Sequence, residues 1–413
     1  MKISLARPDI TELERRYVLE VLNTSNLSLG PKLQEFEKKI AKYVGCRYAI
    51  AVNSGTSGLH LIIRAMGIGE GDEVITTSFS FIASANCILF ERAKPVFIDI
   101  DAETLNIDVR KIVEKLRGLK RIEDLKKIKA ILAVDIFGQP AEWDELKEIA
   151  KNYNLKLIED CAEALGAEYK GKKAGSLGDA GVFGFYPNKQ ITTGEGGTIV
   201  TNDEKIARLC RSMRNQGRDE GSDWLEHKRL GYNYRLSDIN CALGLAQLER
   251  INEILEKRDK VARMYNERLA DMNEVETPYV SQEINPSPSP NLSPQGRGNE
   301  EMIIPSPPRG EGIGRKVKIS WFVYVVRLRG DYTRAERDKI LKGLRERGVE
   351  CRAYFSPIHL QPFYRKMFGY KKGDFPITES ISERTIALPF YNNLKEEEIN
   401  YVVENLKKII RRW

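Results

Sequence analysis

The sequence has few of the residues that build metal sites and disulfide frameworks. Only three of its 413 residues are histidine, so a histidine-rich metal site is not expected and no metal ligands are predicted. Its six cysteines are scattered, and none stands in Cys-x-x-Cys spacing. This usage favours reduced thiols in a cytoplasmic protein over a disulfide framework or a zinc site.

Long apolar runs and blocks of like charge are missing as well. No run approaches 18 apolar residues, and the N-terminus contains no apolar segment, so the sequence predicts no membrane span and no signal peptide. The net charge is +7, but acidic and basic residues are interleaved along the whole chain. Binding to nucleic acid is therefore not indicated.

Short apolar runs alternate with amphipathic stretches between about residues 48 and 200. The runs are rich in isoleucine and valine and are bounded by turn residues, which predicts buried strands at 48–53, 73–78, 95–100, 130–136 and 156–160. Two more strands are expected in the runs AGVFGFY and GTIVTN. Strands and helices in alternation predict an α/β fold with a mostly parallel sheet that helices cover on both faces.

The second half of the chain predicts a smaller domain. After about residue 203 the pattern turns helical. Apolar residues keep helical spacing from residue 237 to residue 272, which predicts one long helix leading into an α+β unit. We expect a large domain with an N-terminal arm over 1–250 and a small C-terminal domain over 251–413. Residues 281–315 hold seven of the 17 prolines and almost no core-forming residues. They predict a disordered insertion, with a PxxP ligand as the alternative.

Lys189 stands between an apolar, strand-like stretch and a glycine-rich loop, in the run GVFGFYPNKQITTGEGG. Burial lowers the pKa of a lysine amine and makes it a nucleophile toward carbonyl groups, as a Schiff base requires. The alternative is a lysine that extends from the end of a strand into solvent. A Schiff base would indicate pyridoxal phosphate, which needs a phosphate-binding loop, a partner for its pyridine nitrogen and a residue stacked on its ring.

Candidates for these three features precede Lys189, each at or just beyond the carboxyl end of a predicted strand, where open α/β sheets bind ligands. The segment NSGTSG (53–58) opens a helix with small residues, so it could hold a phosphate or simply cap the helix. Asp160 ends a buried run and could pair with a protonated pyridine nitrogen or cap the next helix. Phe81 could lie flat on the ring or belong to the core.

Several motifs give the sequence a resemblance to a known family. NSGTSGLHL, IEDCAEALGAEYKG, FYPNKQITTGEGG and LGYNYRLSDINCALGLAQL occur in this order, and SPIHLQPFY and ISERTIALPFY follow. The chain resembles the DegT/DnrJ/StrS-type sugar aminotransferases over nearly its whole length, apart from residues 281–315. The resemblance implies pyridoxal 5'-phosphate as cofactor and the type I fold of the pyridoxal-phosphate-dependent transferases, that of aspartate aminotransferase.

The resemblance also implies roles for individual residues. Lys189 corresponds to the lysine that binds the cofactor, Asp160 to the partner of the pyridine nitrogen and Phe81 to the ring-stacking aromatic residue. Gly55 and Thr56 correspond to residues that bind the cofactor phosphate at the start of the helix, and the hydroxyl of Ser57 is expected to add a hydrogen bond. Asn233 corresponds to an asparagine that reaches the cofactor phosphate of a neighbouring subunit, which implies a homodimer with shared active sites.

Other residues bear on the substrate or depart from the common pattern of the family. The resemblance implies that Glu195 shapes the loop beside the lysine and that His359 lies near the sugar pocket, where we expect it to contact substrate or to be a packing residue. Tyr354 stands at a substrate-side position that is often histidine. Glu163 stands where many members have glutamine or histidine near the phenolic oxygen of the cofactor, and Gly184 stands where many have a phosphate-binding serine.

The reaction that the resemblance implies is a ping-pong transfer of an amino group. Glutamate is the expected donor, and the acceptor is a nucleotide-linked keto-deoxy sugar for cell-surface polysaccharide or related glycan synthesis. We expect the keto group at carbon 4, with carbon 3 as the second choice. Related dehydratases have histidine at the position of Lys189, which argues against that activity. A cyclitol aminotransferase and a non-catalytic regulator on the same fold are the remaining alternatives.

Overall fold

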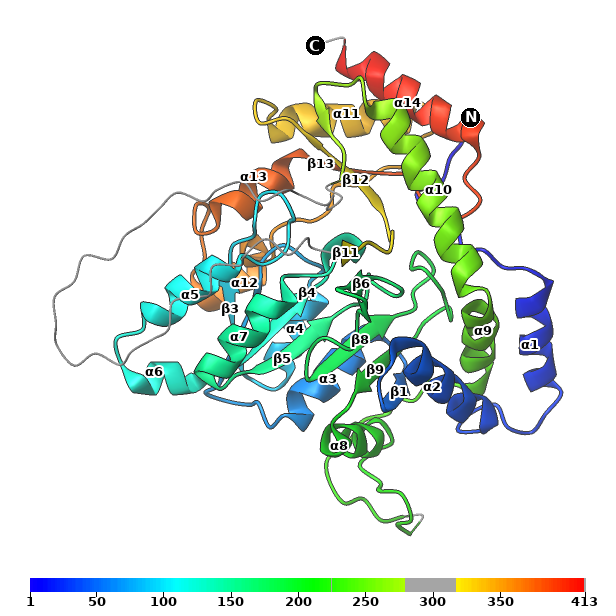
Figure 1. The fold of residues 1–413 in the computed structure, drawn as a ribbon, viewed down its shortest axis with the longest axis vertical. Coiled ribbons are helices and arrows are strands. Elements are labelled where there is room, and N and C mark those ends of the chain that lie inside the picture. Colours follow the sequence, from blue (N-terminus) through cyan, green and yellow to red (C-terminus); the bar gives the residue numbers. More distant parts are fainter. Residues whose placement is uncertain (224, 279–316, 412–413) are drawn as a thin grey trace.

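The computed structural model describes residues 1–223, 225–278 and 317–411, and the predicted insertion at 281–315 lies outside these ranges. A large domain surrounds a central sheet, and a smaller domain lies above it in Figure 1. Helix α10 (Ile251–Leu269) runs from one domain to the other. The arrangement agrees with the predicted α/β fold class.

The central sheet has seven strands in the order β1-β9-β8-β5-β4-β2-β3. The strands from β8 to β3 run parallel to one another, whereas β9 is antiparallel to both β1 and β8. The seven strands are β1 (Tyr48–Val52), β2 (Glu73–Thr77), β3 (Lys94–Ile98), β4 (Ile128–Val134), β5 (Lys156–Asp160), β8 (Ala180–Gly184) and β9 (Gly197–Thr201). The sheet is therefore mostly parallel, as the alternating pattern predicts.

The sheet is apolar on both faces because helices cover both. In β4, Leu132 belongs to a core shared with α3, α4 and α8, whereas Ile131 belongs to a core shared with α5 and α7. Successive side chains of a strand point to opposite faces, so residues 130–134 of this strand form a continuous apolar run. The covering helices include α2 (Pro31–Val44), α3 (Gly55–Ala65), α4 (Ala83–Phe90), α5 (Val109–Arg117), α6 (Ile122–Lys127), α7 (Trp143–Tyr153) and α8 (Glu204–Arg214).

The single long helix predicted over residues 237–272 is wrong, because the structure has two helices there. Helix α9 (Asp238–Glu249) ends just before Arg250, and α10 begins just after it. Arg250 forms ion pairs with Asp9, at 3.2 Å, and with Glu14, at 2.8 Å. Arg250, which lies at the break between the two helices, therefore binds the N-terminal arm.

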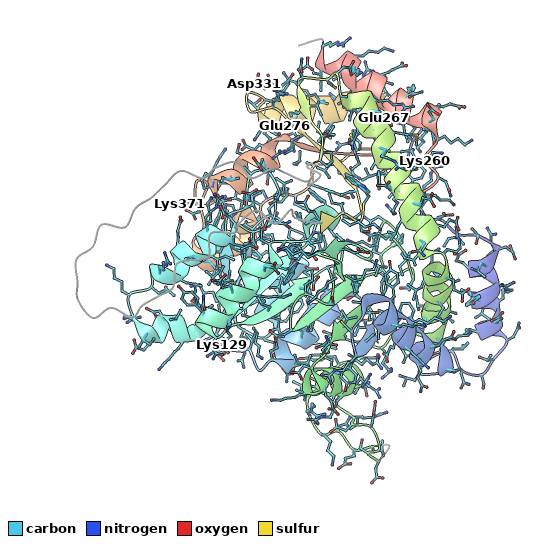
Figure 2. All side chains as sticks on the ribbon, in the orientation of Figure 1. Lys129, Lys260, Glu267, Glu276, Asp331 and Lys371 are labelled. Carbon is cyan, nitrogen blue, oxygen red and sulfur yellow. The ribbon has the colours of Figure 1, made fainter. Side chains whose placement is uncertain are left out.

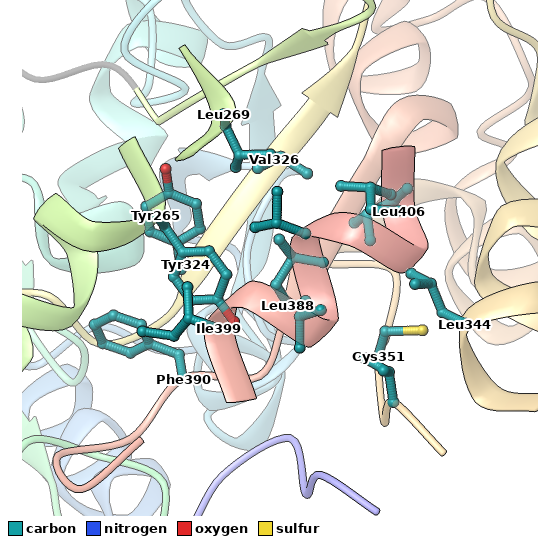
Figure 3. Close-up of a cluster of buried hydrophobic side chains, with 14 of the residues drawn as sticks. Tyr265, Leu269, Tyr324, Val326, Leu344, Cys351, Leu388, Phe390, Ile399 and Leu406 are labelled. Atoms are coloured by element: carbon teal, nitrogen blue, oxygen red, sulfur yellow. The ribbon is translucent and has the colours of Figure 1, made fainter. Parts of the chain in front are cut away.

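The small domain is built on a three-stranded sheet of β10 (Val275–Glu276), β12 (Tyr324–Leu328) and β13 (Thr385–Leu388). Its core includes Tyr265 of α10, Tyr324 and Leu388, which Figure 3 shows beside α14 (Glu396–Ile410). Ile3, close to the N-terminus, is fully buried in the same core. The other elements are α1 (Glu12–Leu22), β6 (Glu168–Tyr169), β7 (Lys172–Lys173), β11 (Val317–Lys318), α11 (Arg334–Glu346), α12 (Pro362–Phe368), α13 (Pro376–Arg384) and two short 3-10 helices (Ile136–Gly138 and Ile358–Leu360).

Charged side chains stand on the outside of both domains, and those labelled in Figure 2 include Lys129, Lys260, Glu267, Asp331 and Lys371. Within the described ranges, no helix combines the length and the apolar character that crossing a membrane requires.

Candidate active site

A cavity of about 810 Å³ lies at the carboxyl ends of β4, β5 and β8, beside the first turn of α3. The small domain closes one side of it with Phe322 and residues 353–356. Nine of the residues that the sequence singles out line this cavity: Gly55, Thr56, Phe81, Asp160, Glu163, Gly184, Lys189, Glu195 and Tyr354. The structure therefore gathers most of the predicted site in one place.

Lys189 points into the cavity and not into solvent. Its side chain is 15% exposed, and its Nζ lies 3.6 Å from Oε1 of Glu163 and 3.9 Å from the centre of the Phe322 ring. Burial lowers the pKa of the Lys189 amine, while the carboxylates of Glu163 and Asp160 oppose this shift. A buried amine with a lowered pKa has the properties of a nucleophile toward carbonyl groups.

Asp160 ends β5 as a buried carboxylate, only 5% exposed. Its Oδ2 accepts a hydrogen bond of 2.7 Å from Oγ of Ser84, and its Oδ1 accepts one of 3.3 Å from the N–H of Ala162. Burial raises the pKa of Asp160, although these hydrogen bonds lower it. Within the described ranges no cationic side chain lies within 4.0 Å of this carboxylate, so the site fits a cationic group of a bound molecule.

The first turn of α3 forms the opposite side of the cavity. Ser54 caps the helix by accepting a hydrogen bond of 3.1 Å from the N–H of Ser57. Ser57 is buried against this cap and does not line the cavity, whereas Gly55 and Thr56 do. A Cβ on Gly55 would lie 3.5 Å from Cα of Gly184, which shows how closely the two glycines approach. A helix N-terminus that opens into a cavity with glycines on both sides fits a phosphate.

Phe81 and Glu163 complete the lining near Lys189. Phe81 is 61% exposed and lines the cavity, so its ring offers an apolar surface there. Such a surface fits the planar ring of a ligand. Glu163 is buried, and its Oε2 accepts a hydrogen bond of 2.9 Å from the N–H of Phe137. Burial raises the pKa of Glu163, while Lys189 lowers it.

Tyr354 lies near Glu163, and burial together with that carboxylate raises the pKa of its phenol. Its ring stacks on Phe355, with 5.0 Å between the ring centres. Glu195, in contrast, is exposed at the edge of the cavity. Tyr354 and Glu195 therefore both line the cavity.

Besides Ser57, two predicted residues, His359 and Asn233, do not line the cavity of this chain. His359 is fully buried, with Nδ1 2.6 Å from Oγ of Ser78 and Nε2 3.0 Å from Oε1 of Glu379. Both ring nitrogens are thus already engaged, and the structure does not place His359 against a substrate. Asn233 is exposed, and it pairs through its backbone with Asn215 on the outer side of the large domain.

Sequence reasoning missed Ser84 and Phe322, which contact Asp160 and Lys189 respectively. Ser84 lies only three residues after Phe81, so the loop that follows a predicted strand was a signal for it. Phe322 stands more than 130 residues after Lys189, in a run that the sequence predicts only as a strand of the small domain. In the part of the chain that the structure describes, no cluster of histidine, cysteine and acidic residues could hold a metal ion.

Known proteins are similar to this chain over nearly its whole length. The GDP-perosamine synthase of Caulobacter vibrioides is 38% identical over 411 residues, which cover 99% of this chain and 98% of the relative. Helicobacter pylori PseC, an aminotransferase involved in the biosynthesis of pseudoaminic acid, aligns with a TM-score of 0.85 at 27% identity and covers 100% of both chains.

The PLP-form of the putative sugar aminotransferase Spr1654 from Streptococcus pneumoniae aligns with a TM-score of 0.83 at 25% identity, over 100% of this chain and 99% of the other. These likenesses confirm the predicted type I fold. The model of the DegT/DnrJ/EryC1/StrS aminotransferase family matches residues 8–292 and 299–407. The chain therefore belongs to the DegT/DnrJ/EryC1/StrS aminotransferase family.

Proposed function

We propose that this protein is a pyridoxal-phosphate-dependent aminotransferase that moves an amino group from glutamate to a nucleotide-linked keto-deoxy sugar. Membership of the family confirms the predicted aminotransferase class, and the PLP-form of a structural neighbour supports the cofactor. The Caulobacter relative is named for a GDP-linked product, which supports a nucleotide-linked substrate. The choice of carbon 4 over carbon 3, and of glutamate as donor, follows from the resemblance.

One observation carries the proposal. One cavity holds a buried lysine amine, an open helix N-terminus and the buried carboxylate of Asp160, which has no cationic side chain within 4.0 Å among the described residues. Each of the three features is unfavourable or incomplete alone, since buried charges need partners and helix N–H groups need acceptors. A molecule with an aldehyde, a protonated ring nitrogen and a phosphate satisfies all three.

Bound pyridoxal phosphate supplies an aldehyde that exchanges amino groups and a ring that holds negative charge developed on carbon. Asp160 would hold the proton on the ring nitrogen, because a carboxylate beside that nitrogen favours its protonated form. Gly55 and Thr56 would bind the phosphate, and Phe81 would cover the ring. Lys189 would bind the aldehyde and later, as a free amine, move a proton as general base and acid.

The second subunit enters the proposal through Asn233. This side chain is exposed in the single chain and does not line the cavity of its own chain. It is therefore available to a second copy, which agrees with the homodimer with shared active sites that the resemblance implies. Exposed apolar residues of the N-terminal segment, Leu19, Leu22, Leu27 and Leu29, offer further surface for such a contact.

Two linked measurements test the proposed function. Purified protein is expected to show visible absorbance from bound cofactor, and borohydride is expected to attach the cofactor permanently to the peptide that contains Lys189. Nitrogen-15-labelled glutamate, with UDP-, dTDP- and GDP-linked 4-keto and 3-keto sugars, is then expected to give a labelled amino sugar.

Lys189→Ala is the control, and it is expected to lack both the attachment and the transfer. Failure of the wild-type protein to bind the cofactor would refute the proposal that it is a pyridoxal-phosphate-dependent enzyme. Cofactor binding without transfer to any keto sugar would refute the substrate class, and labelled product from a cyclitol ketone would replace it.

A further inference from the structure

Arg258 of α10 is a buried cation in an unusual position. It is 2% exposed, and within the described ranges no carboxylate lies within 4.0 Å of its guanidinium. Burial lowers the pKa of Arg258 to about 10, with only a distant contribution from Asp9 in the opposite direction. Burying an unpaired charge is costly, so a guanidinium in this place needs other polar partners.

Backbone carbonyl groups of two separate segments supply those partners. Nη2 donates hydrogen bonds to the carbonyls of Lys189, at 2.8 Å, and Asn188, at 3.4 Å. Nη1 donates to the carbonyls of Phe322, at 3.2 Å, and Trp321, at 3.4 Å. The first segment belongs to the large domain, and the second leads into the small-domain strand β12. One planar guanidinium thus joins the two domains beside the cavity, a geometry that a lysine amine cannot reproduce.

The two segments also contact each other in the cavity, through Lys189 and Phe322. Nζ of Lys189 lies 3.9 Å from the centre of the Phe322 ring. Arg258 therefore holds the backbone of the residue that carries the amine and the backbone of the residue that the amine touches. If the small domain shifted relative to the sheet, the hydrogen bonds of Arg258 would pass the shift to the backbone of Lys189 and so move its amine.

We propose that Arg258 is a positioning residue for Lys189: it fixes the place of the amine relative to the small domain and adds a positive charge beside it. This inference rests on the proposed function for its relevance to amino transfer. Charges that face the amine come from Glu163, Asp160 and Arg258. The two carboxylates favour the ammonium form of Lys189, while burial and Arg258 favour the neutral amine that reacts with carbonyl groups.

A second buried arginine, Arg337, provides a control, and its Nε also donates to Oδ1 of Asp338 at 2.8 Å. Arg337 of α11 is 4% exposed, and its Nη1 donates to the carbonyls of Ser382, at 3.1 Å, and Thr385, at 3.2 Å. It lies in the small domain and does not line the cavity. Arg337→Met therefore removes a buried, carbonyl-bound arginine without touching Lys189.

The test measures the reactivity of Lys189 in the full-length protein freed of cofactor. Acetic anhydride is applied over a range of pH, and acetylation of the peptide containing Lys189 is quantified by mass spectrometry against an exposed lysine such as Lys260. Arg258→Met is expected to move the pH midpoint of Lys189 acetylation upward, because the neighbouring cation is lost. Arg258→Lys keeps the charge, so its midpoint is expected to stay closer to that of the wild type, while its plateau reactivity rises several-fold because the bridge is lost.

A residue that only stabilises the fold would behave differently. Arg337→Met is expected to lower the melting temperature and leave the midpoint and plateau of Lys189 unchanged. An Arg258→Met midpoint equal to that of the wild type would overturn the electrostatic part of the inference, with Arg258→Gln measured in its place if the methionine variant does not fold. An unchanged plateau in Arg258→Lys would overturn the bridging part.

Kinetics separate this inference from the proposed function. In the cofactor-loaded enzyme, Arg258→Lys is expected to lower the rate of the first half-reaction by roughly 10- to 100-fold, as misplacement of a reacting group does, with a smaller change in KM. A wild-type protein that transfers no amino group would refute the proposed function and leave the acetylation result intact. Normal transfer by Arg258→Lys would refute the positioning role and leave the proposed function intact.

Discussion

Gly184 offers a sharp test of how the cavity binds a phosphate. It is the last residue of β8, it lines the cavity, and it faces Gly55 at the start of α3. A Cβ built at position 184 would lie 3.5 Å from Cβ of Ala162 and 3.8 Å from its carbonyl oxygen, both ordinary contacts. The backbone there needs no positive φ. Gly184→Ser should therefore fold normally and place the hydroxyl that many relatives have.

The expected gain follows from one added hydrogen bond to a charged group. A hydrogen bond to an ion contributes about 1.5–3 kcal/mol, which corresponds to roughly 10- to 150-fold tighter binding of the cofactor. The lower half of that range is expected if the open cavity already supplies water to the phosphate. Stability should change by less than about 1 kcal/mol, since replacing a glycine in an extended conformation mainly restricts the unfolded chain.

The measurement is a titration of cofactor-free protein with pyridoxal phosphate, followed by absorbance. Gly184→Ala is the matched control, because it adds the same Cβ without the hydroxyl. Inorganic phosphate should compete more strongly in the serine variant than in the alanine variant. Equal affinities of the serine and alanine variants for the cofactor would refute the placement of the phosphate beside β8 and α3.

Three further predictions concern the amine, the N-terminal arm and a tight loop. Glu163→Gln removes a charge 3.6 Å from Nζ of Lys189, a coupling of at most about 5 kcal/mol at an effective dielectric constant of about 20, so acetylation of Lys189 should reach its midpoint at lower pH. Burial raises the pKa of Glu14, but hydrogen bonds from Thr11, Arg250 and Gln247 lower it overall to about 2. The ionised carboxylate should therefore contribute about 3 kcal/mol to the free energy of unfolding above pH 4.5, and this contribution should vanish toward pH 2. In acid unfolding, the difference in stability between wild type and Glu14→Gln should shrink as the pH falls. Gly138 has φ +88°, and a Cβ there would lie 1.8 Å from the carbonyl oxygen of Ser320, so urea unfolding of Gly138→Ala should show a loss of roughly 2–4 kcal/mol. An unchanged unfolding free energy would mean that this loop moves freely.

The sequence predicts best what depends on local pattern. The strands that end at Asp160 and Gly184 are visible as apolar runs, and parallel strands bring their carboxyl ends to one edge, so the cavity could be placed before any coordinates. His359 shows the limit, because its neighbour Ile358 lines the cavity while the histidine turns toward Ser78. Side-chain direction in an irregular segment depends on packing that a motif does not record.

Arg258 shows a second limit of prediction from the sequence, which arises from contacts between distant segments. In the sequence it stands in a charge-rich helical stretch, EKRDKVARMYNER, where an arginine is normally solvated. It is buried because α10 crosses between the sheet domain and the small domain at that point. The break at Arg250 has the same origin, since its partners Asp9 and Glu14 lie more than 230 residues earlier. Only the folded chain shows which charges of a helix face inward.

The Lys189 amine lies where opposing charges act on it, and this balance can be tested directly. Glu163 favours its ammonium form, and Arg258 favours its neutral form. The variants Glu163→Gln and Arg258→Met should therefore move the midpoint of Lys189 acetylation in opposite directions. The double variant should lie between them, and its departure from the sum of the two shifts measures the coupling between the two groups. A double variant that shifts further than either single variant would mean that both substitutions act by opening the cavity and not through charge. In that case the pKa of the amine would be governed by burial alone, and the small domain would control the reactivity of Lys189 by excluding water.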